Sequence, residues 1–205
     1  FSVVLNKKPW QQFKFSYEND LDVSSNEGVT FGEDNILSGL YRRRDTPQKI
    51  IDHEKFRAHY EKDWIWGISN SITFTSVKMH PLFDIYYYNQ KDSLVTDINN
   101  AELDLGFRFA YREKFLFDNY RRYSLGTNYP VFTFHYKMGI PDFGGSDFNY
   151  KSIELTLEDY FLLGSFGSTT YSIKAGKVFG TLPTLLLESP PGNETYFMNH
   201  GNFNL

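Results

Sequence analysis

Residues 101–112 read AELDLGFRFAYR, and the alternation within them decides the fold class. Every odd position from Leu103 to Tyr111 is apolar or aromatic. The charged residues all occupy even positions: Glu102, Asp104, Arg108 and Arg112. Because successive side chains of a β-strand point to opposite faces, this period of two predicts a strand with one apolar face and one charged face.

The same alternation recurs along most of the chain. It is found in residues 13–18, 56–61, 68–76, 131–138, 152–158 and 170–176. No segment of helical length shows a competing period of 3.6 residues, and polar stretches such as residues 142–147 separate the alternating segments. The sequence therefore predicts an all-β chain with antiparallel pairing.

Composition excludes several classes of protein. Aromatic residues make up 19% of the 205 residues, although the mean hydropathy is −0.47 and the net charge is −4. A disordered chain has few aromatic residues and a large net charge, and a helical membrane protein needs about 18 consecutive apolar residues, so neither class fits. The near-neutral charge gives no electrostatic footprint for nucleic acid, and the lack of cysteine excludes disulfides and thiolate metal sites.

Two architectures produce this alternation, and they differ in what touches the apolar face. In a soluble sandwich or small barrel, the apolar side chains point inward and the charged side chains meet water. In a transmembrane barrel, the apolar side chains meet lipid and the polar side chains line or fill the lumen. Alternation alone does not choose between them.

Three further features favour the transmembrane barrel. The clearest alternating segments run to about nine to twelve residues, which is the length of a tilted membrane-crossing strand. Polar faces carry basic and acidic residues in balance, which fits a lumen of paired charges as well as it fits a solvated exterior. Aromatic residues gather near strand ends, as in the interfacial girdles of outer-membrane barrels. The members of this interfacial set are Trp64, Trp66, Tyr120, Tyr123 and Tyr129.

We therefore predict an antiparallel transmembrane β-barrel, present in part, with about eight to ten strands in this segment. We expect one barrel domain over residues 1–205, belonging to a longer chain. The predicted lumen-facing polar residues are Glu102, Asp104, Arg108, Arg112, His135, Lys137, Glu154, Glu158 and Lys174. The predicted lipid-facing residues are Leu103, Leu105, Phe107, Phe109, Phe132, Phe134, Ile153, Leu155 and Leu157.

Three stretches carry a resemblance to a known family. They read LGFRFAYREKF (105–115), YSLGTNYPVFTFHYKMGIPDFGGSDFNYKSIELTL (123–157) and LGSFGSTTYSIKAGKVFG (163–180). Their order resembles the C-terminal barrel region of a Bacteroidota outer-membrane family of unknown function, whose members carry an N-terminal carboxypeptidase-regulatory-like domain. That region is distantly similar to the barrels that assemble or translocate other outer-membrane proteins.

The resemblance implies a location in the bacterial outer membrane, with lipid and other envelope proteins as partners. The near-neutral charge predicts no nucleic-acid partner. It implies a structural, transport or envelope-assembly role as a subunit of a larger complex. It implies neither an enzyme nor a cofactor, because the carboxypeptidase-like name belongs to a non-catalytic module outside this segment.

Candidate catalytic and metal sites have simpler explanations. His53, Glu54 and His59 miss the H-E-x-x-H spacing of a zinc site, and His135 fits a hydrogen bond on a polar strand face. Carboxylates two or four positions apart in a strand lie on the same face because of the pleat, so their proximity does not indicate a catalytic role. We expect salt bridges from Arg108, Arg112 or Lys174 to the carboxylates of Glu102, Asp104, Glu154 and Glu158. We predict no catalytic and no metal-binding residue.

One alternative of a different class stays open. A soluble β-rich module could bind carbohydrate by stacking it on exposed tryptophan and tyrosine rings. A hydrolase rests only on the acidic pairs and is the least favoured interpretation.

Overall fold

A computed structural model describes residues 1–23, 50–88, 94–118 and 121–187 of the chain. The chain divides into two compact units. The first comprises Phe1–Tyr17, Lys55–Val77 and Asn99–Thr181, and the second comprises Glu18–Glu54, Lys78–Ile98 and Leu182–Leu205. The expectation of one barrel domain over residues 1–205 stays a prediction.

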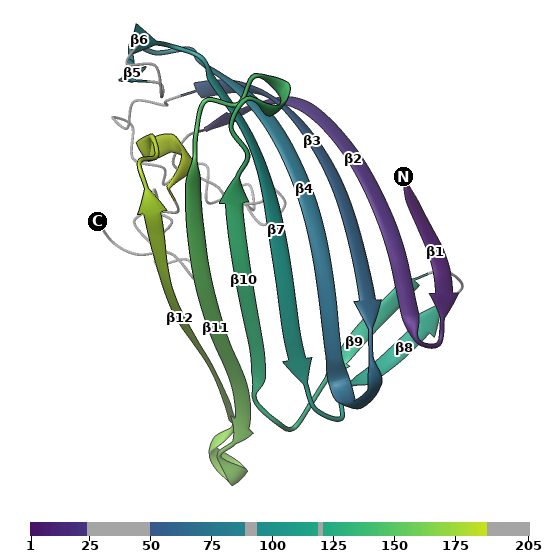
Figure 1. The fold of residues 1–205 in the computed structure, drawn as a ribbon. Helices are drawn as coiled ribbons and strands as arrows, with labels where there is room; N and C mark the ends of the chain where they lie inside the picture. Colours follow the sequence, from purple (N-terminus) through teal and green to yellow (C-terminus); the bar gives the residue numbers. More distant parts are fainter. Residues whose placement is uncertain (24–49, 89–93, 119–120, 188–205) are drawn as a thin grey trace, which may run out of the picture. The chain divides into compact units, whose positions relative to one another are not determined.

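One eight-stranded sheet dominates the structure (Figure 1). Its strand order is β1-β2-β3-β4-β7-β10-β11-β12, which follows the order of the chain. The strands are β1 (Ser2–Lys7), β2 (Trp10–Val23), β3 (Ile50–Asp63), β4 (Ile68–Pro81), β7 (Ile98–Ala110), β10 (Val131–Gly139), β11 (Tyr150–Leu162) and β12 (Ser168–Gly180). All pairings from β7 through β12 are antiparallel, as is that of β1 with β2. The predicted all-β fold is confirmed.

Two small hairpins and four single-turn 3-10 helices complete the described residues. In the second unit, β5 (Tyr87–Tyr88) pairs with β6 (Leu94–Val95). In the first unit, β8 (Lys114–Asp118) pairs with β9 (Arg121–Gly126). The 3-10 helices are η2 (Ile65–Gly67), η3 (Phe143–Gly145), η4 (Gly164–Phe166) and η5 (Thr184–Leu186). No helix in the described part of the chain is long and apolar enough to cross a membrane.

The register keeps like side chains opposite each other. Phe134 on β10 lies opposite Phe107 on β7 and Leu155 on β11, while Lys137 lies opposite Asp104 and Ser152. Since the pleat places every second residue on the same face, this register builds one continuous apolar face and one continuous polar face across β7, β10 and β11.

The sheet has two edges within the described residues. β1 and β12 stand at the ends of the strand order and do not pair with each other. The structure therefore shows one large, mostly antiparallel sheet, whereas the closed barrel expected from the sequence is not part of it.

Buried residues of the first unit form no large apolar core. The buried apolar residues are Trp10, Val77, Ala101, Ala110, Phe148 and Tyr150, and the buried polar residues are Gln12, Thr75, Asn100 and Ser146. The large side chains of the apolar face remain half-exposed to exposed. The sheet therefore buries its polar face more fully than its apolar face.

Candidate functional site

The polar face of the sheet in the first unit is the candidate functional site. Its residues come from alternate positions of neighbouring strands, as the sequence predicted. All the predicted polar residues on β7, β10, β11 and β12 share it: Glu102, Asp104, Arg108, His135, Lys137, Glu154, Glu158 and Lys174.

Arg112 departs from that prediction. β7 ends at Ala110, and Arg112 lies in the following turn with a φ of 53°, a left-handed conformation that side chains seldom adopt. The alternation of the sequence runs on through Tyr111 and Arg112, but the backbone leaves the strand before them. Arg112 is thus a turn residue and not a member of the strand's polar face.

Cavities hollow the polar face in the described part of the chain. The larger cavity, of about 660 Å³, is lined by charged and hydroxyl side chains of β2, β3, β4, β7 and β10. These include Lys14, Arg57, His59, Thr73, Thr75, Glu102, Asp104 and Lys137. A second cavity, of about 290 Å³, lies where the β8–β9 hairpin approaches the same face, and Phe115, Arg122 and Ser124 line it from the hairpin.

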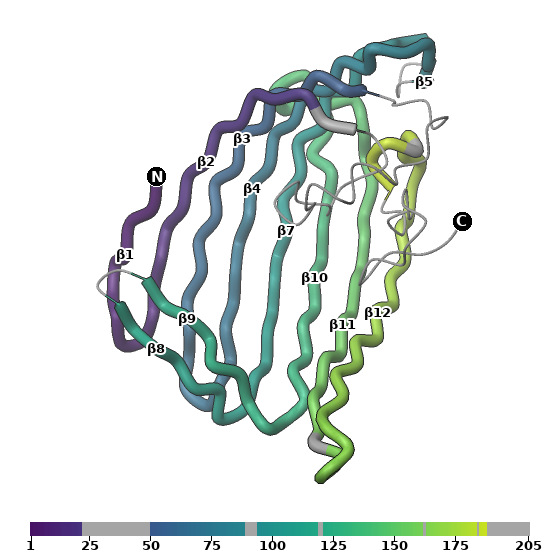
Figure 2. Tube along the Cα trace, turned by 180° about the vertical axis from the view of Figure 1, so that it is seen from behind, coloured from purple at the N-terminus to yellow at the C-terminus, as the bar shows by residue number. Residues whose placement is uncertain are grey.

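The β8–β9 hairpin lies across the polar face. Figure 2 shows the hairpin in front of β1 to β4 on this side of the sheet. The ring of Phe117 on β8 is 6.0 Å from the buried ring of Trp10 on β2. The guanidinium of Arg122 on β9 lies 5.0 Å from the Trp10 ring and 4.5 Å from the Phe115 ring. Aromatic and cation–π contacts thus hold the hairpin against β2.

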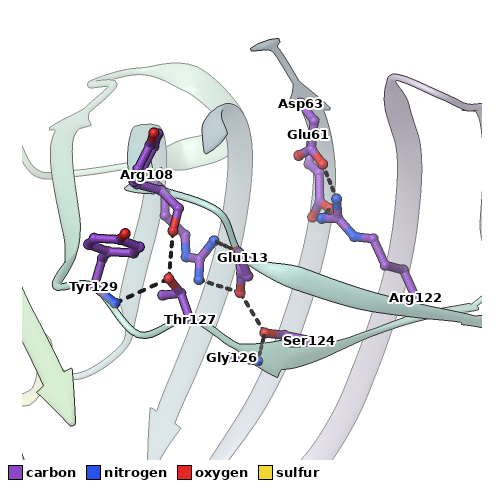
Figure 3. A network of polar contacts seen from close by, with 10 residues as sticks. Glu61, Asp63, Arg108, Glu113, Arg122, Ser124, Gly126, Thr127 and Tyr129 are labelled. Atoms are coloured by element: carbon purple, nitrogen blue, oxygen red, sulfur yellow. Dashed lines mark hydrogen bonds and ion pairs between the residues drawn. The ribbon is translucent and has the colours of Figure 1, made fainter. Parts of the chain in front are cut away.

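Arg122 also joins the hairpin to β3 through two carboxylates (Figure 3). Its Nη2 donates a hydrogen bond of 2.8 Å to Glu61 Oε1, and its Nη1 donates to Asp63 Oδ2. Both carboxylates and the guanidinium are largely shielded from solvent. Charge-assisted hydrogen bonds of this kind are stronger than neutral ones, and shielding preserves their strength.

Glu113 closes the base of the hairpin (Figure 3). Arg108 donates two parallel hydrogen bonds to its carboxylate, of 2.6 and 2.8 Å, and Ser124 Oγ donates a third of 2.5 Å. The Glu113 side chain is only 4% exposed. Burial alone raises the pKa of this carboxyl, but the hydrogen bonds from Arg108 and Ser124 and the charge of Arg108 outweigh it, so the pKa lies below its ordinary value.

Other carboxylates of the polar face are paired as well. His135 Nδ1 lies 3.0 Å from both oxygens of Asp104, and Lys174 Nζ lies 3.3 Å from Glu154 Oε1. The Tyr150 hydroxyl donates a 2.5 Å hydrogen bond to Glu102 Oε2. The expected partnership of Lys174 with the acidic residues is confirmed for Glu154. Arg108 pairs instead with Glu113, a residue that the pattern did not single out.

Histidines of the sheet serve in this hydrogen-bonding network. His59 Nδ1 lies 2.8 Å from Thr73 Oγ1, and its Nε2 lies 3.4 Å from Glu61 Oε2. Within residues 1–23, 50–88, 94–118 and 121–187, no group of three or more histidine and acidic side chains is arranged to hold a metal ion. The ion pairs and hydrogen bonds of the polar face thus connect the strands of the sheet to one another and to the β8–β9 hairpin.

A family model matches residues 11–182 of the chain, from β2 to beyond β12. Its description is the C-terminal domain of a family of unknown function (DUF5686). The chain belongs to this family. No curated protein and no solved structure matches this DUF5686 domain.

The predicted lipid-facing residues of the DUF5686 domain share the face opposite the ion pairs. Phe132 lies opposite Phe109 and Leu157, and Tyr136 lies opposite Leu105 and Ile153. The exposed fractions include 40% for Phe107, 42% for Phe132 and 48% for Leu155. The sheet thus presents a ladder of large apolar side chains that its own elements leave uncovered at these positions.

The predicted interfacial aromatics occupy different settings. Trp64 and Trp66 lie at the β3–β4 turn and are 53% and 78% exposed. Tyr129 precedes β10 and stacks edge-on against Tyr111, with ring centroids 5.0 Å apart. Tyr123 belongs to β9, so it lies on the hairpin and not at an end of a sheet strand. Tyr120 lies outside the described residues.

Sequence reasoning missed the hairpin of this DUF5686 domain and its anchors Asp63, Glu113 and Arg122, although the alternation placed Glu61 on a polar strand face. It also missed Tyr150 on β11, which binds Glu102. One signal was available. Residues 115–117 are apolar, and the Asp-Asn pair at positions 118 and 119, a combination typical of turns, separates them from a second short segment that contains Tyr120 and Tyr123.

Proposed function

We propose that this sheet is part of a transmembrane β-barrel in a bacterial outer membrane, with its apolar face against lipid and its polar face toward the lumen. The observation that carries the proposal is the inverted burial of the two faces. The side chains of Glu113, Arg122 and Asp104 are 4%, 15% and 15% exposed, whereas whole-residue exposure reaches 48% at Leu155 and 57% at Ile173.

Inverted burial is unfavourable in water and favourable in a bilayer. Each square ångström of apolar surface left in water forgoes about 25 cal/mol, and soluble monomers seldom expose a large continuous apolar patch. In a bilayer the same surface meets hydrocarbon, while charged groups must be paired away from lipid. The ion pairs of Arg108, Arg122 and Lys174 meet this second requirement.

Strand length supports the same proposal. β3 and β4 each contain 14 residues, and β7, β11 and β12 each contain 13. A tilted strand needs about 9–11 residues to cross the hydrocarbon core, so these strands are long enough to cross it and reach both interfaces.

The β8–β9 hairpin would occupy part of the barrel lumen. Because β8 and β9 lie on the polar face, a barrel closed around that face would hold the hairpin inside its lumen. We infer a transport or envelope-assembly role, as a subunit of a larger envelope complex, in which this hairpin narrows the passage. The family resemblance of the sequence supports a Bacteroidota outer membrane as the setting.

Paired cysteine substitutions test the orientation of the two faces. The chain contains no cysteine, so Leu155→Cys and its neighbour Thr156→Cys each give a single label site on opposite faces of β11. In native membranes we expect a spin label at position 155 to be relaxed by oxygen, which partitions into lipid, and a label at position 156 by a water-soluble nickel chelate.

Two outcomes separate the proposal from its alternative. Heating-dependent migration of the native protein in a detergent gel, together with recovery in the outer-membrane fraction, supports the barrel. A protein that stays in solution without detergent, with both labels accessible to the nickel chelate, contradicts it and favours the soluble carbohydrate-binding module, which would use the exposed rings of Trp64 and Trp66.

A further inference from the structure

Two turns of the first unit meet at one end of the sheet. A Cβ atom on Gly67, in the β3–β4 turn, would lie 2.1 Å from the carbonyl oxygen of Ala110 at the end of β7, so the two backbones are in close contact. A cavity of about 320 Å³ opens between these turns, and its lining includes Trp64, Trp66, Tyr111 and Arg112.

Two cations at these turns are stacked on aromatic rings. The Arg112 guanidinium lies 5.3 Å from the Tyr111 ring centroid, and Lys62 Nζ lies 4.0 Å from that of Trp64. Neither cation has a carboxylate partner among the described residues. The two acidic residues in the lining do not neutralise Arg112, because Asp63 is bound by Arg122 and Glu113 by Arg108.

The same turns carry a run of exposed apolar side chains. Trp64, Ile65 and Trp66 are 53%, 77% and 78% exposed. Lys62 shares the apolar face of β3 with Phe56 and Tyr60 through strand alternation. The face therefore passes from apolar residues to a lysine and then to tryptophan rings, which is the sequence of environments across a lipid–water boundary.

The backbone is strained at two residues of the cavity lining. Trp66 has a φ of 72° and Arg112 a φ of 53°, both in the left-handed region, and these two residues line the same cavity from adjoining turns. Such conformations cost free energy and occur preferentially at binding sites, where the surrounding contacts hold them.

We propose that the β3–β4 and β7–β8 turns bind the phosphate of an anionic phospholipid, such as phosphatidylglycerol. Arg112 supplies a planar fork of donors that matches phosphate oxygens, and Lys62 adds a second positive charge at the end of β3. Trp64 and Trp66 place their rings at the headgroup level, and Ile65 enters the boundary with the acyl chains. The inference rests on the proposed membrane location of the sheet.

Native mass spectrometry of the detergent-solubilised protein tests this site with two lipids. We expect dioleoylphosphatidylglycerol to be retained in preference to dioleoylphosphatidylcholine. Arg112→Gln should reduce that preference by about fivefold, the effect of one basic residue near an anionic lipid surface. Lys62→Gln should also reduce the preference for phosphatidylglycerol. This second variant provides the test if Arg112→Gln fails to fold.

Lys8→Gln is the matched control, because it removes one positive charge from the exposed β1–β2 turn without touching the cavity. Equal retention of the two lipids, or the same loss of preference in Lys8→Gln, would overturn the inference. Complete displacement of phosphatidylglycerol by inorganic phosphate would identify a site for free anions and would also overturn it. If the protein inserts into the membrane and is heat-modifiable but shows no lipid preference, only this inference is contradicted. If the protein never inserts, the proposed function is contradicted.

Discussion

Arg122 on β9 and Glu61 on β3, 61 positions apart in the chain, form an ion pair of 2.8 Å that ties the β8–β9 hairpin to the polar face of the sheet. Asp63 binds the same guanidinium, and the Trp10 ring lies beneath it. One side chain of the hairpin thus contacts both β2 and β3. The position of the hairpin depends on Arg122 more than on any backbone pairing, since β8 and β9 pair only with each other.

Removal of the Arg122 charge should release the hairpin. Arg122→Met keeps the length of the side chain but leaves Glu61 and Asp63 without their shared partner, and hydrogen bonds to charged groups are each worth about 1.5–3 kcal/mol. We expect chymotrypsin to cleave near Phe117 at least several times faster in the variant under conditions that leave the sheet folded. Arg121→Met is the matched control, because Arg121 is exposed. Equal cleavage of the two variants would contradict this role of Arg122.

Glu113 should make the base of the hairpin sensitive to acid. Its pKa in the folded chain lies below the ordinary 4.5, so its contribution to stability is fully present above that value and is lost as the pH falls through the lower, folded-state pKa. We expect protease protection of the hairpin to fall below a pH of about 4.5 in the wild type. In Glu113→Gln the protection should be weaker at neutral pH and should change less with pH than in the wild type, and an identical pH profile would refute the assignment.

Gly139 should tolerate no side chain. A Cβ atom at this position would lie 2.6 Å from the ring of Tyr150 and 2.8 Å from the carbonyl oxygen of Phe148. Tyr150 is buried and its hydroxyl is bound to Glu102, so the ring has little room to move. We expect Gly139→Ala to lower the free energy of unfolding by about 1–3 kcal/mol in a urea titration.

Gly176→Ala provides the comparison for Gly139→Ala. Its nearest contact would be the Ile153 carbonyl oxygen at 3.1 Å, so a small adjustment of the strand accommodates the methyl group. The loss of stability should be clearly smaller than for Gly139→Ala, and an equal loss would show that the Tyr150 ring is not the cause.

The two faces of the sheet could be predicted from the sequence because strand alternation is a property of the backbone. Once residues 101–110 and 131–138 are read as strands, the faces of Asp104, Phe107 and Phe134 follow. The register that places Phe134 opposite Phe107 comes from the structure, because alternation is unchanged by a slip of two residues. Local rules suffice here, since each side chain's face depends only on its position in its own strand.

The hairpin and the turn conformations could not be predicted in the same way. β8 and β9 contain five and six residues, too few for a period to stand out, and the partner of Arg122 lies 61 positions away. The left-handed conformation of Arg112 has no signal in its residue type. The turn that begins after Ala110, where β7 ends beside Gly67 of the β3–β4 turn, interrupts the alternation that placed Arg112 on the polar face.

Single lysine substitutions at two neighbouring positions of β12 can show whether lipid or water covers the apolar face. Ile173 and Ser172 lie near the middle of the strand on opposite faces, and Ile173 is 57% exposed. If water covers the apolar face, Ile173→Lys should change the free energy of unfolding by no more than about 0.5 kcal/mol, as at other surface positions. If lipid covers it, a lysine near the bilayer midplane should cost about 2–4 kcal/mol. Ser172→Lys, opposite Glu158 on the polar face, should be neutral or stabilising in either case. We expect a urea titration of the protein folded into phospholipid vesicles to show the large loss for Ile173→Lys alone, and a small effect of both lysines would contradict the membrane barrel.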